Sequence, residues 1–176
     1  MEAAEKVIRA GVLKLGASML GELLAADPGH RGPRVPCGNG HEAEFISCRD
    51  KTIDTVLGPV TLTRAWYHCK ACKHGFAPRD AELGVAGASL SPGLAAMNDR
   101  AAAAGPFAGA AGLLEDLGGV RLSAKRVERA AEASGAAQAA AVRERSAWSP
   151  PGRWCRCRRP RCRTSCMASS TAPACR

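Results

Sequence analysis

Aromatic residues are scarce in this chain. They make up 4% of its 176 residues, although 46% of the residues are hydrophobic, so small side chains supply much of the apolar content. Close-packed helices are therefore favoured over a core built around large aromatic rings. The length allows one or two small domains.

The sequence also lacks a long apolar run and a secretion signal. No stretch approaches the roughly 20 apolar residues of a membrane-spanning helix, and Glu2 and Glu5 stand where a signal peptide needs positive charge. We therefore expect no membrane partner and a cytoplasmic, reducing environment. In that environment, paired cysteines are more commonly metal ligands than disulfides.

Acidic residues are missing from residues 146–176, which carry seven arginines. The net charge is +9, but the first 145 residues hold 25 − 7 = 18 bases against 16 acids, so the body of the chain is nearly neutral. The tail shows no apolar period, and we expect it to be disordered. Alternatively, its arginines form a nucleic-acid-binding arm and its clustered cysteines a second metal site: Cys155, Cys157, Cys162 and Cys166.

Two close pairs of metal-binding residues frame the centre of the chain. They are Cys37-Gly-Asn-Gly-His41 and Cys69-Lys-Ala-Cys72. Zinc takes thiolate and imidazole ligands in a tetrahedron, and pairs on two separate turns supply them. We predict a structural zinc ion bound by Cys37, His41, Cys69 and Cys72. Two alternatives stay open: another nearby side chain replaces one of these ligands (Cys48, His68 or His74), or the four are ordinary reduced cysteines and a solvated histidine.

The segment between the two pairs has the composition of a β-hairpin. Residues 52–57 and 60–67 are rich in β-branched and aromatic side chains, and Gly58-Pro59 is the expected turn. A hairpin that brings the second pair back to the first gives a zinc-ribbon-like module, which we place at 30–80. The zinc deaminase signature is excluded, because Ala43 and His68 stand where it needs a glutamate and a proline.

Residues 2–26 show the spacing of an amphipathic helix. Apolar side chains recur every three or four positions, at Ile8, Val12, Leu15, Met19 and Leu23, and Asp27-Pro28-Gly29 ends the pattern. Three internal glycines weaken this helix, so we expect it to depend on packing or on a partner. We assign it to 1–29 and expect a loop at 76–90.

The second half of the body has the pattern of a helix-turn-helix. Ser91-Pro92 begins a helix to about residue 104, a second helix occupies about 107–117 with Phe107, Ala110, Leu114 and Leu117 on one face, and Ser123 caps a third helix that continues to about residue 145. Val127, Ala130 and Ala131 are expected to face inward. We predict DNA contacts by the basic residues Arg121, Lys125, Arg126 and Arg129. A plain helical hairpin is the alternative, because Glu128 and Glu132 share the outward face.

These segments together predict an α+β protein of small domains. The order is an N-terminal helix at 1–29, a zinc-ribbon-like β-hairpin module at 30–80, a helical helix-turn-helix DNA-binding region at 81–145 and a disordered tail at 146–176. The end of the last helix is a spacer or a contact between two copies, so we expect a homodimer formed through helices.

This order resembles the N-terminal half of bacterial insertion-sequence transposases of the ISKra type. The likeness covers roughly residues 15–145. It is carried by Leu24-Ala25-Ala26-Asp27-Pro28-Gly29-His30-Arg31-Gly32, Arg49-Asp50-Lys51-Thr52, Gly58-Pro59-Val60, Arg64-Ala65-Trp66-Tyr67-His68-Cys69, Pro78-Arg79-Asp80 and Val127-Glu128-Arg129. The resemblance implies recognition of the DNA repeats at the ends of a mobile element.

In that family a DDE-type catalytic domain with an RNase H-like fold follows, and three acidic residues there hold two Mg²⁺ ions. Its first catalytic aspartate lies in an Asp-Gly-Thr-Gly strand after a proline-rich linker, and this chain shows neither. The chain departs from the family at about Ser146. We therefore assign no catalytic residue and expect an inactive, truncated product.

The tail is consistent with a shifted reading frame. If the codons from Cys162 to Cys175 are read one base earlier, permitted third bases spell Pro-Asp-Lys-Leu-Tyr-Gly-Val-Val-Asp-Gly-Thr-Gly-Val-Pro, with histidine as the alternative to tyrosine. We infer a frameshift near Ser146. Two other functions stay open: a stand-alone zinc-ribbon and helix-turn-helix transcriptional regulator, and a module that binds protein through the ribbon and the N-terminal helix.

Overall fold

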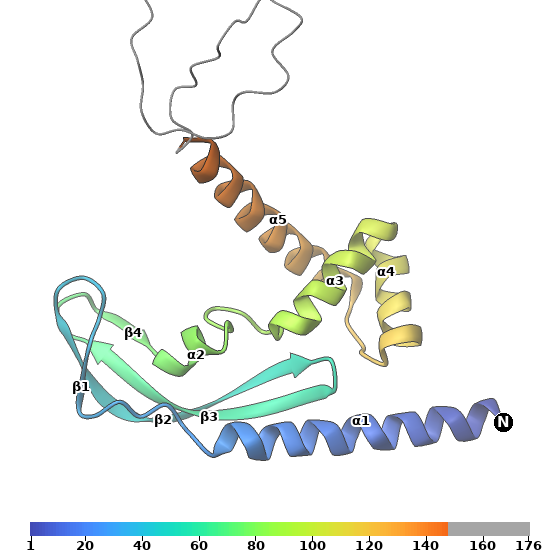
Figure 1. The fold of residues 1–176 in the computed structure, drawn as a ribbon, viewed down its shortest axis with the longest axis horizontal. Coiled ribbons are helices and arrows are strands. Elements are labelled where there is room, and N and C mark those ends of the chain that lie inside the picture. Colours follow the sequence, from blue (N-terminus) through green and yellow to red (C-terminus); the bar gives the residue numbers. More distant parts are fainter. Residues whose placement is uncertain (148–176) are drawn as a thin grey trace, which may run out of the picture. The chain divides into compact units, whose positions relative to one another are not determined.

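The computed structural model describes residues 1–147, which form an antiparallel sheet and a set of helices, an α+β arrangement (Figure 1). Met1–Gln138 is one compact unit, and the end of the last helix belongs to a second unit that begins at Ala139. Within the described part of the chain, no helix has both the length and the apolar character that a membrane crossing demands. The disorder predicted for the tail concerns residues that, from 148 onward, lie outside the part of the chain that the structure describes.

The sheet has four strands in the order β1-β2-β3-β4. Their bounds are β1 Arg34–Pro36, β2 Glu42–Thr55, β3 Gly58–Cys69 and β4 His74–Phe76. The two long strands pair from Thr55↔Gly58 to Glu44↔His68, with one irregularity between Phe45 and Ser47. The predicted hairpin is present. Its first strand begins ten residues before the predicted 52–57 and ends at Thr55, and its second extends the predicted 60–67 by two residues at each end, so that β3 reaches Cys69.

The turn of the hairpin lies two residues before the predicted position. Val56 and Leu57 form the turn, whereas Gly58 and Pro59 already belong to β3. The Thr55 hydroxyl explains the shift: its Oγ1 donates to the Gly58 carbonyl at 2.7 Å and accepts from the Leu57 amide at 3.2 Å. Such a side-chain bond stabilises a tight turn directly after threonine.

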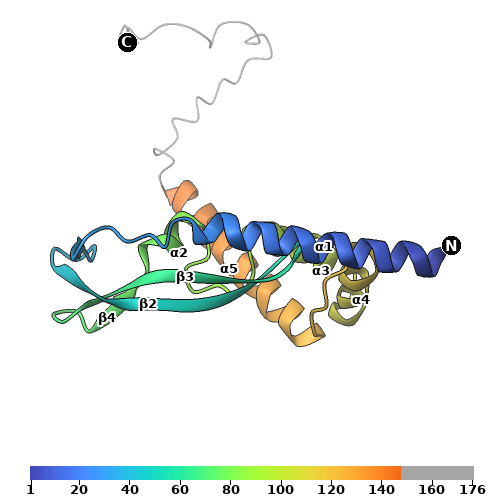
Figure 2. The same ribbon diagram turned by 90° about the horizontal axis from the view of Figure 1, so that it is seen from below.

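Helix α1, Glu2–Ala25, lies along the hairpin (Figure 2). Its apolar stripe, predicted from the spacing, does not face the sheet. Ala17, Leu20 and Leu24 pack against the sheet core of Ile53, Val60, Leu62 and Val85. The five predicted stripe residues are instead 62–71% exposed. The helix can approach the sheet closely on this side, because Gly16 lies against Leu57 and Gly21 against Val60.

The segment predicted as a loop at 76–90 contains a short helix, α2, at Pro78–Glu82. Proline in the first turn favours helix initiation there. The helix places Asp80 in a nearly buried position, where it pairs with Lys51 at 3.3 Å and with Arg64 at 3.2 Å. Two strand positions therefore carry bases that share one carboxylate from α2 as their partner.

The remaining helices form a cluster with a core of its own. They are α3 Pro92–Ala104, α4 Phe107–Leu113, the π-helical turn η1 Leu114–Gly118 and α5 Ala124–Ala147. Ser91 caps α3 as predicted, since its side chain accepts a hydrogen bond from the Leu94 amide. The core contains Leu90, Leu94, Ala110, Leu114, Val120, Leu122 and Val127. Val127 is fully buried, as the sequence predicted.

The second helix departs from its predicted apolar face. Ala110 and Leu114 are buried, but Phe107 is 38% and Leu117 is 73% exposed. The π-helical turn explains the position of Leu117, because its wider turn changes the spacing on which the predicted face depends. Gly119 then ends the element in the left-handed conformation, with φ of 71°.

Candidate metal centre

Two tight turns position the four predicted metal ligands at one end of the sheet. Cys37 follows β1, and its amide donates to the His41 carbonyl at 2.9 Å, which closes the first turn. Gly38 and Gly40 have φ of 86° and 78°, values that glycine adopts without strain. Cys69 ends β3, and Cys72 lies in the connection to β4.

The structure brings Cys37, His41, Cys69 and Cys72 together. One ligand atom from each lies within 4.8 Å of the other three. The Cys37 and Cys72 sulfurs are 3.8 Å apart, and His41 Nδ1 is 3.2 Å from the Cys72 sulfur. These cysteines are free thiols, since a disulfide would require about 2.05 Å between sulfurs.

The distance between the Cys37 and Cys72 sulfurs fits a tetrahedral ion. With Zn–S bonds of about 2.3 Å, two sulfurs at adjacent corners of a tetrahedron are about 3.8 Å apart. The Cys37–Cys72 distance has this value. Cys69 is fully buried, Cys37 and Cys72 are half-buried and His41 is exposed, so one side of the cluster adjoins the module core. The cluster could therefore bind a metal ion.

Local hydrogen bonds prepare one thiol for metal binding. The pKa of Cys37 is lowered to about 6 by hydrogen bonds. The backbone amide of Asn39 has the largest effect, and the His41 amide and the thiols of Cys69 and Cys72 add to it. The Asn39 side chain also lowers the pKa of Cys72, but hydrogen bonds from Cys69 and Cys37 together with burial outweigh it and raise that pKa. At neutral pH the cluster thus holds one thiolate, the form that binds metals.

The alternative ligands lie outside this cluster of the described residues. Cys48 is exposed on β2 and pairs with Ala65 across the hairpin. His68 and His74 belong to β3 and β4, and their neighbours across the strands are Gly75 and Cys69. The four-residue set found by spacing is therefore the set that the fold assembles.

Three of the four predicted DNA-contacting residues form ion pairs with carboxylates of this chain. Arg121 pairs with Glu115 at 2.6 Å and Arg126 with Asp54 at 2.6 Å. Lys125 pairs with Glu128 at 2.8 Å, a bond that raises the pKa of its ammonium group. The sequence identified Glu128 as a neighbour on the same face, but it could not show that Asp54, from the hairpin, reaches Arg126.

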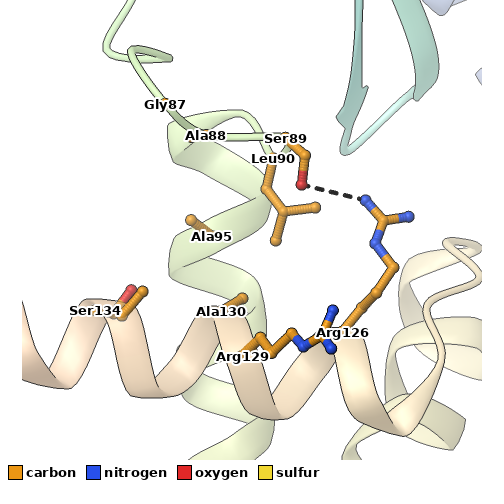
Figure 3. Close-up of a pocket in the computed structure, with 10 residues that line it drawn as sticks. Gly87, Ala88, Ser89, Leu90, Ala95, Arg126, Arg129, Ala130 and Ser134 are labelled. Atoms are coloured by element: carbon orange, nitrogen blue, oxygen red, sulfur yellow. Dashed lines mark hydrogen bonds between the residues drawn. The ribbon is translucent and has the colours of Figure 1, made fainter.

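Arg129 differs from these three. It is exposed and makes no ion pair within residues 1–147. Together with Arg126 it lines a cavity of about 370 Å³ between α5 and the segment before α3 (Figure 3). Leu90, Ala95 and Ala130 supply apolar walls, and the Ser89 hydroxyl lies 3.4 Å from the Arg126 guanidinium. A helix-turn-helix geometry for α4 and α5 stays a prediction.

A joint between α1, the hairpin and α2 was not found from the sequence. Asp27 lies within 3.4 Å of both Arg31 and Arg79, and Arg31 also pairs with Glu82 at 2.9 Å. Gly29 has φ of 72°, and a Cβ there would lie 2.7 Å from the Cβ of Arg79. The alternating charges of these segments were the available signal, but their partners lie up to 52 residues apart.

Tyr67 fastens the linker between α1 and the metal cluster. Its buried hydroxyl accepts from the Arg31 amide and donates to the Gly32 carbonyl, both at 2.9 Å. This anchor and the charged joint use residues from three of the segments that carry the transposase resemblance. No protein-family model, curated protein or solved structure matches the chain, so the resemblance stays a prediction.

Proposed function

We propose that this chain is the DNA-binding N-terminal part of an ISKra-type insertion-sequence transposase, built around a structural zinc site. The observation that carries the proposal is the assembly of Cys37, His41, Cys69 and Cys72 into one cluster at the end of a hairpin. Zinc modules of this size commonly serve to position nucleic-acid-binding elements. The adjacent helical cluster, with its exposed Arg129, supplies such an element.

Zinc is the ion that best suits this set of side chains. Three thiolates and an imidazole match zinc sites of the Cys₃His type, whereas Mg²⁺ requires oxygen ligands. Four protein ligands leave no open coordination position for a substrate, so the ion would stabilise the fold and take no part in a reaction. Mg²⁺ belongs to the catalytic domain of the intact family, and we assign none to this chain.

The segments behind the resemblance support it at the level of the fold. Asp27, Gly29, Arg79 and Tyr67 hold α1, the linker and the sheet in place through hydrogen bonds of 2.7–3.4 Å. Residues with such roles are expected to recur among proteins that share this fold. They are not expected to catalyse a reaction, which agrees with a module that recognises element ends without cutting them.

Arg129 is the proposed principal base contact. Arg121, Lys125 and Arg126 would have to exchange a carboxylate for a phosphate, and each exchange reduces the net gain from binding DNA. We therefore expect modest affinity from the nearly neutral body, with sequence preference concentrated on one side chain. The arginines of residues 146–176 would add salt-sensitive, sequence-independent affinity.

The test is DNA binding by the zinc-loaded chain with Arg129→Ala and a matched control, Arg100→Ala. Arg100 is an exposed base on α3 without an ion pair in residues 1–147. On duplexes carrying the terminal repeats of a related element, Arg129→Ala should weaken specific binding by about 1–3 kcal/mol at matched salt. Arg100→Ala should leave it unchanged. Equal binding by Arg129→Ala and the parent chain would contradict the proposal.

The transcriptional regulator stays the alternative function, and the nucleotide sequence of the locus separates the two. The transposase proposal requires that the nucleotide sequence, when it is read one base earlier from about Ser146, contains an open frame. This frame should encode Asp-Gly-Thr-Gly and continue toward two further acidic residues. A stop codon before that aspartate favours the regulator. A chain that binds no DNA at low salt favours the protein-binding module instead.

A further inference from the structure

The outer face of α1 carries a row of large apolar side chains that nothing in the described part of the chain covers. Ile8, Val12, Leu15, Met19 and Leu23 are each more than 60% exposed, and α1 contains no buried residue along its 24 positions. An apolar stripe of this length, roughly 24 Å at 1.5 Å per residue, is unusual on a protein surface that stays in water.

Three of the charged side chains of α1 make contacts away from the stripe. Glu2 and Lys6 pair with each other at 2.7 Å, and the Arg9 guanidinium donates to the carbonyls of Asp116 and Leu117. Arg9 therefore faces the rest of the unit, whereas the apolar stripe faces solvent. Because Ala17, Leu20 and Leu24 already pack on the sheet, the stripe is a second apolar face of the same helix, and this indicates that the outer face is an interface.

The outer face carries a seven-residue repeat. Ala4, Gly11, Ser18 and Ala25 follow one another at intervals of seven and are all exposed. Ile8 and Leu15 have the same interval, and Val12 and Met19 lie beside them. A heptad repeat is the pattern by which helices pair along their length, and small residues in one column let two helix backbones approach closely.

We propose that a second copy of this chain packs on the outer face of α1, so that two α1 helices form the core of a homodimer. A like helix fits this face because each copy offers both a column of small residues and a row of larger apolar side chains. Only Glu5, Lys14 and Glu22 border the stripe, so electrostatic attraction to a polyanion is absent. Residues 148–176, with seven arginines and no apolar period, do not match it either.

The first experiment is sedimentation equilibrium on the full, zinc-loaded chain. The parent chain should have twice the mass of 18.3 kDa, or 2 × 18.3 = 36.6 kDa. Leu15→Glu should weaken dimerisation by about 100-fold or more, because two leucines leave the interface and each is worth at least tenfold. Leu117→Glu is the matched control, since Leu117 is 73% exposed outside the stripe, and it should dimerise like the parent.

A second variant separates loss of pairing from loss of folding. Nothing lies within 4 Å of a Cβ built at Gly11, so Gly11→Leu fits the single chain and should raise its helix stability. The same leucine fills the small-residue column and should weaken dimerisation at least tenfold. Zinc content measured in parallel reports on the metal cluster independently. A monomeric parent chain, or Leu15→Glu and Gly11→Leu chains that dimerise as tightly as the parent, would overturn the proposal.

Discussion

Replacement of Cys69 by serine tests whether the metal cluster holds this end of the sheet together. The Cys69 side chain is completely buried, with 0% exposure. It belongs to the same buried cluster as Val35, Ala43, Ala65 and Tyr67. Since Tyr67 is the one large side chain fully buried in that cluster, apolar burial alone gives limited stability here. The metal is expected to supply the remainder.

The size of the effect follows from the ligand number. Structural zinc sites in small modules have apparent binding free energies of about 10–16 kcal/mol, or roughly 3 kcal/mol for each of four ligands. Cys69→Ser should therefore weaken zinc binding by at least about 100-fold. The sheet end should then unfold at lower denaturant concentration, whereas the helical core around Leu94 should persist because it shares no residue with the metal cluster.

The assay combines zinc content, competition with a chelator and urea unfolding followed by circular dichroism. Cys48→Ser is the matched control, because Cys48 is exposed on β2 and lies outside the four-residue cluster. It should bind one zinc ion per chain, as the parent does. The reasoning is refuted if Cys69→Ser retains parental zinc affinity, or if Cys48→Ser loses the metal.

Two further substitutions or conditions test the joint between α1 and α2. Gly29→Ala should lower the free energy of unfolding by more than about 1 kcal/mol, because φ at Gly29 is positive and the new Cβ would clash with Arg79. Gly135→Ala, in open space on α5, should raise the free energy of unfolding slightly. Urea unfolding of both variants checks this. The pKa of Asp27 is lowered chiefly by the Gly29 amide, and that of Glu82 chiefly by Arg31. Both groups therefore contribute stability above their unfolded pKa values of 3.8 and 4.5 that is lost as pH falls through the folded values, so the melting temperature should decrease below about pH 4.5. A melting temperature that is constant from pH 6 to pH 3 would contradict this.

The metal cluster shows how much a local pattern can determine. Cys37 with His41 and Cys69 with Cys72 were identifiable because each pair lies on a single turn, and a hairpin between them returns the second pair to the first. The caps at Ser91 and Ser123 were equally accessible, since a capping side chain bonds to amides within three residues of itself. Interactions of short range in sequence can be derived without the fold.

The face of α1 was decided by tertiary structure alone. Its periodicity correctly predicted a helix, but an apolar stripe indicates only that some surface covers it, and the sheet accepts the side with Ala17 and Gly21 because small residues allow close approach. The ion pairing of Arg126 on α5 has the same origin. Arg126 was predicted to be free for DNA, yet Asp54, 72 residues earlier, reaches it across the fold. Sequence periodicity thus determined which elements form. Packing and ion pairing between distant segments determined which apolar faces stay exposed and which bases stay free to bind a partner.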